Sequence, residues 1–287
     1  MDVDIRTASA ADVGLLQEWA LREGWGAGVG DIEAFHRVDP EGFLVARLEG
    51  RPVGSISAVR YGDSYAFIGY YIVEQDLRGQ GIGHALFDAA LVHVGARSCG
   101  LDGVAAQVRT YESLGFAPAY AMTRFTGSTP IASSTLAGEA LDVAPVTGDD
   151  IAAIADYDAA HVPVRRDAFV RAWLAAASPR RTFAVRRSGA IAGYATVRPA
   201  EGGGSRIGPL FADDLAVARA LLGATAVAAL MWGDEIAIDV PRPHTQAVDL
   251  MESLGFSGGY TCTRMYRGAV RALPLDRIWG NTTFELG

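Results

Sequence analysis

The spacing of hydrophobic positions predicts alternating strands and helices in the first part of this 287-residue chain. Apolar and polar residues alternate over residues 42–62, which predicts a hairpin of two strands joined by a turn at Gly50. An apolar run at 64–73 predicts a third strand that ends at Val73. The remaining predicted elements are helices over 11–23, 31–37, from about 82 to 94 and 105–114, and strands over 99–102 and 116–126.

This order of elements predicts an α/β (α+β) fold with a mixed, mostly antiparallel sheet and flanking helices. The strand ending at Val73, the helix ending at Val94 and the strand around Cys99 form a crossover unit. A crossover connection joins parallel strands, so these two strands should be parallel and the others antiparallel.

Segments that recur at an offset of 140 residues indicate that this fold is duplicated. The sequence YESLGF at 111–116 returns as MESLGF at 251–256, and YAMTRF from Tyr120 returns as YTCTRM from Tyr260. We therefore expect two units, 1–127 and 142–287, joined by a linker at 128–141 whose Ser, Thr, Ala, Gly and Pro content is typical of a loop.

The composition of the chain excludes several classes of partner and of chemistry. The net charge is −8, which disfavours nucleic acid, and monomer and homodimer both remain open. Every basic residue is Arg, which excludes a Walker A lysine and a Schiff-base lysine. Cys99 and Cys262 have no metal or disulfide spacing, so we expect free thiols, a cytoplasmic protein and no metal. The most apolar window, 216–232, is interrupted by Arg219 and is too short for a membrane span, so we expect no membrane partner.

The segment VEQDLRGQGIGHALFDAAL at 73–91 carries glycines at 79, 81 and 83 before a helical pattern. A helix N-terminus presents unpaired backbone N–H groups and a positive dipole end, which attract phosphate, and glycines let the phosphate approach. Arg78 can pair with a phosphate oxygen. The segment therefore predicts a pyrophosphate site without metal, although the glycines alone are equally consistent with a tight surface turn.

The same segment resembles the acyl-CoA signature R/Q-x-x-G-x-G/A of the GNAT superfamily of N-acetyltransferases, and YESLGF resembles that superfamily's Tyr-containing helix followed by Gly-Phe. The whole chain further resembles a tandem subgroup with an N-terminal GNAT domain, a degenerate C-terminal GNAT-like domain and a terminal strand of the TTFELG type, here residues 282–287. The resemblance implies acetyl-CoA as cosubstrate in the first unit, bound in a gap where the two parallel strands splay apart. The implied cofactor-binding residues are Tyr71, Ile72, Val73, Arg78, Gly79, Gln80, Gly81, Ile82, Gly83 and His84.

The implied reaction is direct attack of a small-molecule amine on the thioester. By the family pattern Tyr111 is the acid that protonates the leaving thiolate. The base is left open between single carboxylates, with Glu74 named first, and a relay through water. The candidate substrate-binding residues are Glu23, Trp25, Asp31 and Asp102.

The second unit lacks the glycines, and Asp213 and Asp214 stand near the expected helix start, where they would cap the helix and repel phosphate. Met251 replaces the tyrosine. We expect this unit to shape the acceptor cleft and not to bind CoA in the same way. Two alternatives remain: a non-catalytic acyl-CoA-binding sensor, and an acetyltransferase that acts on a peptide or protein amine.

Overall fold

The computed structural model describes residues 3–136, 141–175 and 179–287. The first half of the chain contains β1 (Asp4–Thr7), α1 (Ala10–Arg22), α2 (Asp31–Val38), β2 (Phe43–Leu48), β3 (Arg51–Tyr61), β4 (Tyr65–Val73), α3 (Ile82–Val94), β5 (Ser98–Val104), α4 (Val108–Ser113), β6 (Ala117–Ser128) and α5 (Thr129–Thr135). The second half contains β7 (Val143–Pro145), α6 (Ile151–His161), α7 (Asp167–Trp173), β8 (Arg181–Arg187), β9 (Ala190–Pro199), β10 (Ser205–Ala212), α8 (Leu215–Ala229), β11 (Glu235–Pro241), α9 (Thr245–Ser253), β12 (Ser257–Arg267) and β13 (Ile278–Gly280).

The predicted α/β (α+β) class and the order of elements are confirmed, and two details differ. The short strand β1 pairs with β2 and was not predicted. Helix α5 occupies half of the expected loop at 128–141, with Pro130 in its first turn. Residues 137–140 of the expected linker lie outside the described residues.

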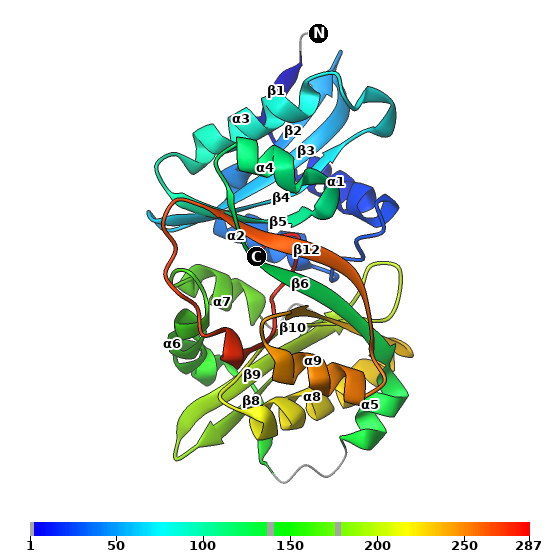
Figure 1. The fold of residues 1–287 in the computed structure, drawn as a ribbon, viewed down its shortest axis with the longest axis vertical. Coiled ribbons are helices and arrows are strands. Elements are labelled where there is room, and N and C mark those ends of the chain that lie inside the picture. The colour runs from blue at the N-terminus through cyan, green and yellow to red at the C-terminus, as the bar shows by residue number, and fades with distance from the viewer. Residues whose placement is uncertain (1–2, 137–140, 176–178) are drawn as a thin grey trace.

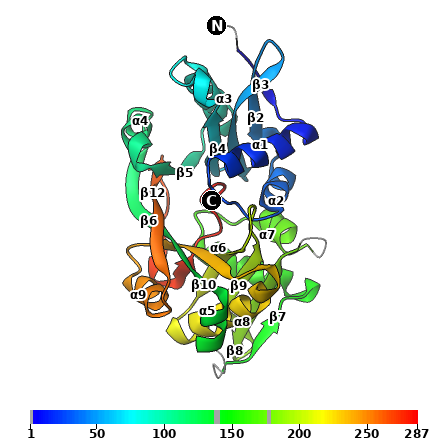
Figure 2. The same cartoon turned by 90° about the vertical axis from the view of Figure 1, so that its right-hand side faces the viewer.

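The two halves exchange their last strands. The predicted parallel pair is present as β4 and β5, but the other neighbour of β5 is β12 from the second half. Strand β6, expected to complete the first half, pairs instead with β11 and β12. One sheet therefore runs through both halves in the order β1-β2-β3-β4-β5-β12-β6-β11-β10-β9-β8-β7. Figure 2 shows β6 and β12 side by side along one flank of the molecule, reaching from one half to the other.

The helices form three layers around this sheet (Figure 1). Helices α3 and α4 cover the outer face of the first half, and α5, α8 and α9 cover the outer face of the second. Helices α1, α2, α6 and α7 share one core between the halves, where Phe35 lies 4.8 Å from Phe169 between ring centroids. Helix α8 is long and apolar enough to span a membrane by composition, but it packs against the sheet as part of the second core.

Strands β4 and β10 carry bulges at equivalent positions of the repeat. In β4, Tyr70 has a positive φ of 44°. On β3, Ser55 and Ser57 pair with Ile72 and Gly69, so one residue of β3 faces two of β4. Such a bulge bends a strand and increases its twist, and here it turns β4 away from β5.

The terminal segment, residues 281–287, crosses both bulges. A Cβ at Gly69 would lie 1.7 Å from the carbonyl oxygen of Glu285, and a Cβ at Gly208 would lie 2.4 Å from that of Thr282. Because Gly69 and Gly208 have no side chains, the backbone of the terminal segment can pass close to both bulges between the halves. The Tyr61 hydroxyl donates to the carbonyl of Leu286 and holds the end of the chain.

Candidate active site

A cavity opens where β4 and β5 separate. The two strands pair from Tyr65 and Ser98 to Ile68 and Leu101, and beyond this point lies a cavity of about 390 Å³. The first half contributes Tyr71, Ile72, Val73, Arg78, Gly79, Gly83 and Tyr111 to its lining, among others. The second half contributes Tyr260, Cys262, Phe284 and Glu285. The cavity therefore depends on the exchanged strand β12 and on the terminal segment.

The N-terminus of α3 has the features of an anion site. Gly79 and Gly81 have positive φ values of 78° and 90°, and among the described residues no atom lies within 4 Å of a Cβ built on either. Gly81 is the N-cap, so no side chain caps the helix, and the first turn carries no acidic residue. The backbone N–H groups and the positive end of the helix dipole thus face open space, as phosphate binding requires.

The other residues of this loop differ in what they contribute. A Cβ at Gly83 would lie 2.3 Å from the Tyr71 hydroxyl, so this glycine lets α3 pack on β4. Ile82 is buried, His84 is exposed beside Asp88, and Gln80 donates its side-chain amide to the carbonyl of Asp76. Of these, Gly83 alone lines the cavity, which leaves only the backbone of the others to act there.

Arg78, in the loop before α3, forms an ion pair with Glu23 in the loop before α2. Its Nε donates to the carbonyl of Val73 at 2.9 Å, and its guanidinium pairs with Glu23 at 2.5 Å. Both side chains line the cavity and are partly exposed, at 48% and 36% of their surface. The predicted residues Glu23 and Arg78 therefore stand together at the mouth.

Two of the predicted acids do not reach the cavity. Glu74 forms an ion pair with Arg51 at 2.6 Å and is not part of the cavity lining. Asp31 is buried and accepts hydrogen bonds from Arg180, Arg198 and the backbone N–H of Gly28. The structure therefore places Glu74 in an ion pair with Arg51 of β3 and Asp31 among buried arginines, and neither acid is in the lining of this cavity.

The predicted residues Asp102 and Trp25 do line the cavity. Asp102 accepts two hydrogen bonds from Arg264 of β12, at 2.7 and 2.9 Å, and both side chains are buried. Because this pairing occupies both carboxylate oxygens, Asp102 serves mainly to join β5 to β12.

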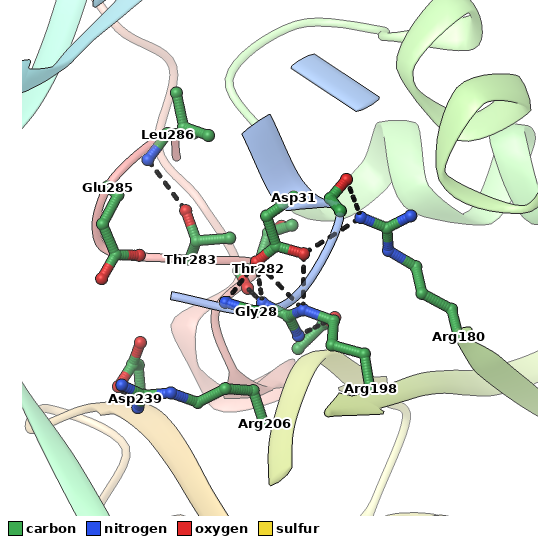
Figure 3. A network of polar contacts seen from close by, with 12 residues as sticks. Gly28, Asp31, Arg180, Arg198, Arg206, Asp239, Thr282, Thr283, Glu285 and Leu286 are labelled. Atoms are coloured by element: carbon green, nitrogen blue, oxygen red, sulfur yellow. Dashed lines mark hydrogen bonds and ion pairs between the residues drawn. The ribbon is translucent and has the colours of Figure 1, made fainter. Parts of the chain in front are cut away.

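Arginines of β6, β9 and β10 fix the loop of residues 23–31. The carbonyl of Trp25 accepts from Arg124 at 2.5 Å and from Arg206 at 2.7 Å. Figure 3 shows Asp31 and Gly28 enclosed by Arg180 and Arg198, with the terminal segment beside them. The second half therefore determines the position of the loop that carries Trp25 in the first.

Tyr111 lies on α4 and lines the cavity from the side of β5. It is buried, and its ring lies 5.8 Å from that of Phe87 on α3. Burial raises the pKa of Tyr111 well above its usual value. The hydroxyl therefore stays protonated at neutral pH, as a proton donor must.

Sequence patterns marked the terminal TTFELG only as part of the tandem resemblance, and they did not place any residue of the second half at this cavity. Tyr260 and Cys262 stand on β12, and Phe284 and Glu285 stand in the terminal segment, more than 140 residues from Tyr111 in the chain. The repeat matched Tyr260 with Tyr120 and placed it in the second unit. Only the exchange of strands, which the repeat does not encode, brings these residues to the first half's cavity.

The helix of the second half that corresponds to α3 is closed to phosphate. Asp214 caps α8 by accepting from the backbone N–H of Val217 at 3.0 Å, and it pairs with Arg187. The buried side chain of Met251 occupies the position that corresponds to Tyr111. Among residues 3–136, 141–175 and 179–287, no group of three or more His, Cys, Asp or Glu is placed to hold a metal ion.

Comparison with known proteins assigns the fold to a family. A family model described as "Acetyltransferase (GNAT) family" matches residues 13–116, and one described as "Acetyltransferase (GNAT) domain" matches residues 154–280. A curated relative, the holothin acyltransferase of Pseudoalteromonas sp. (strain SANK 73390), is 31% identical over 286 residues, which cover 98% of this chain and 94% of the relative. The chain is a tandem GNAT protein.

Solved structures share this tandem GNAT fold. A candidate acetyltransferase from Pyrococcus horikoshii superposes with a TM-score of 0.80 at 21% identity, over 99% of this chain and 96% of the other. A tandem GNAT protein from the clavulanic acid biosynthesis pathway superposes with a TM-score of 0.65 at 16% identity, over 94% and 98%. At these identities the likeness shows the fold alone. The family and the curated relative support acyltransferase activity of the GNAT type.

Proposed function

We propose that this tandem GNAT protein is an acetyl-CoA-dependent N-acetyltransferase that acts on the amine of a small molecule. The observation that carries the proposal is the uncapped N-terminus of α3, flanked by Gly79 and Gly81, at one end of a cavity that also contains Tyr111. A diphosphate site and a proton donor in one cavity are what thioester transfer from CoA requires.

The residues present fit acyl-CoA. Backbone N–H groups of residues 81–84 would hold the diphosphate. The Arg78 guanidinium could also pair with a phosphate oxygen if its ion pair with Glu23 opens. Beyond Ile68, β4 no longer pairs with β5, so its edge at Ile72 and Val73 is open to the amide groups of the pantetheine arm. A backbone N–H of this edge would stabilise the charge that develops on the thioester oxygen.

Starting from an alkylammonium, the chemistry needs two protons removed from nitrogen and one supplied to sulfur. An alkylammonium with a pKa of about 10.4 is only about a thousandth neutral at pH 7, a cost of roughly 4 kcal/mol, so a proton acceptor is needed. Tyr111 lines the cavity, and its hydroxyl would protonate the leaving thiolate, although burial makes it a weaker acid than a free tyrosine.

The aromatic residues that line the cavity favour a small acceptor molecule that is largely apolar. Trp25, Tyr260 and Phe284 surround the inner end of the cavity, and the terminal segment covers the side between the halves. This covering favours a small molecule over a protein lysine, which needs an open groove. Because the curated relative is named for holothin, holothin is the first acceptor to test.

Release of free thiol from acetyl-CoA, measured across a panel of small amines that includes holothin, tests the proposal. We expect turnover on at least one amine and an acetylated product by mass spectrometry. Tight binding of acetyl-CoA without turnover on any amine would instead favour the sensor. Turnover on peptide amines alone would favour the protein acetyltransferase.

A further inference from the structure

Three carboxylates line the cavity: Glu23, Asp102 and Glu285. Glu23 pairs with Arg78 at the mouth, and Asp102 uses both oxygens on Arg264. Glu285 differs because its contact with Arg124 is long, at 3.5 Å, whereas Arg124 forms its short hydrogen bonds, at 2.6 and 2.9 Å, with Asp239. The cation nearest to Glu285 is thus largely neutralised by another acid.

Glu285 is held in place by the backbone around it. Its carbonyl lies over Gly69, at the point where β4 turns away from β5, and Thr283 accepts the backbone N–H of Leu286. The side chain is only 5% exposed. Figure 3 shows its carboxylate turned away from the cluster around Asp31. Glu285 is therefore a fixed, buried carboxylate in the cavity that receives the thioester in the proposed function.

Tyr70 provides a second buried polar group beside Glu285. It contributes to the cavity lining at the β4 bulge and is 1% exposed, and its hydroxyl, which interacts electrostatically with Glu285, has no hydrogen-bond partner among the described residues. An unpaired buried hydroxyl costs free energy, so a hydrogen bond to it would stabilise this region.

We propose that Glu285 accepts the proton of the acceptor amine, which makes it a catalytic residue supplied by the end of the chain. The inference rests on the proposed function. The Glu285 carboxylate takes one proton from the bound ammonium and passes it to solvent, which leaves the nitrogen its electron pair. As the neutral nitrogen then bonds to the thioester carbon, Glu285 accepts its second proton. The carbon–sulfur bond breaks, the electron pair leaves with sulfur, and Tyr111 protonates the thiolate. The products are an amide and CoA, and solvent restores the two proton positions.

The surroundings of Glu285 suit this role. Burial raises the pKa of Glu285 above the ordinary value of a glutamate, which makes the carboxylate a stronger proton acceptor, while Arg124 and Arg206 act in the opposite direction. The titratable and charged groups that face it are Arg124 on β6, Arg206 on β10, Asp239 on β11, Tyr70 on β4, and Tyr260 and Cys262 on β12.

The test compares the full-length wild type with Glu285→Gln, and with Glu252→Gln on the exposed surface of α9 as a control. kcat/KM is measured from pH 6 to pH 10 with the best alkylamine of the panel. We expect Glu285→Gln to lose about 100-fold at pH 7, within the usual range for a general base, and to lose progressively less as the pH rises toward 10, where a much larger fraction of the amine arrives neutral. Glu252→Gln should follow the wild type throughout.

Two further measurements complete the test: acetyl-CoA binding of Glu285→Gln by calorimetry, and the activity of Glu285→Asp. We expect Glu285→Gln to bind acetyl-CoA within about twofold of the wild type, and Glu285→Asp to recover part of the rate at pH 7. A loss that is equal at every pH, or a loss of acetyl-CoA binding, would assign Glu285 a structural role and overturn the proposal. Wild-type turnover with an unaffected Glu285→Gln overturns the role of Glu285 alone, whereas absence of wild-type turnover on every amine overturns the proposed function with it.

Discussion

At the scale of single residues, Tyr111 is the predicted acid whose position agrees best with its assigned role. Removing its hydroxyl in Tyr111→Phe leaves the ring packed against Phe87 and removes the proton donor. We expect kcat to fall by about 10- to 100-fold while acetyl-CoA binding is unchanged, because general acid catalysis acts on the leaving group. Steady-state thiol release and calorimetry measure the two quantities. Full activity of the variant would remove Tyr111 from the mechanism.

Asp31 provides a residue-scale test of stability. Asp31→Asn removes the negative charge that Arg180 and Arg198 share in this buried cluster, so we expect the free energy of unfolding to fall by about 3–5 kcal/mol. Denaturant titration measures this change. Asp63→Asn, at a fully exposed carboxylate, is the control and should leave the midpoint nearly unchanged. A mild effect of Asp31→Asn would contradict the role of the buried arginines in fixing the loop of residues 23–31.

At the scale of elements, the N-terminus of α3 is the feature that sequence predicted best, because its signal is local. Gly81→Val should weaken acetyl-CoA binding by at least about tenfold, since a side chain would enter the space where a phosphate must lie. Gly255→Val is a matched control, because Gly255 also has a positive φ and open surroundings among the described residues. Both variants carry similar backbone strain, so equal affinities would contradict the diphosphate site.

The limits of sequence reasoning also appear at this scale. Hydrophobic periodicity located β2, β3, β4 and α3 because each strand or helix buries a regular set of its own residues. It did not show which acids face the cavity, because Glu74 follows the bulged strand and turns outward to Arg51. The terminal TTFELG, residues 282–287, carries part of the tandem resemblance, but this motif does not show that Glu285 lies beside β4; the fold brings it there.

At the scale of the whole molecule, the exchange of β6 and β12 makes each half depend on the other. A first half produced alone as residues 1–127 would leave β5 without β12 and β6 without β11. We expect this piece to aggregate or to dimerise, and to bind acetyl-CoA only when it is produced together with residues 128–287. Size-exclusion chromatography and calorimetry check this. A monomeric, acetyl-CoA-binding first half would show that the exchanged strand is dispensable.

A crystal structure with acetyl-CoA tests the central claim most directly, because it locates the diphosphate. We expect density for the diphosphate at the backbone amides of residues 79–84, and for the thioester between β4 and β5, near Glu285. Density at the N-terminus of α8, or a diphosphate that makes no contact with α3, would contradict it.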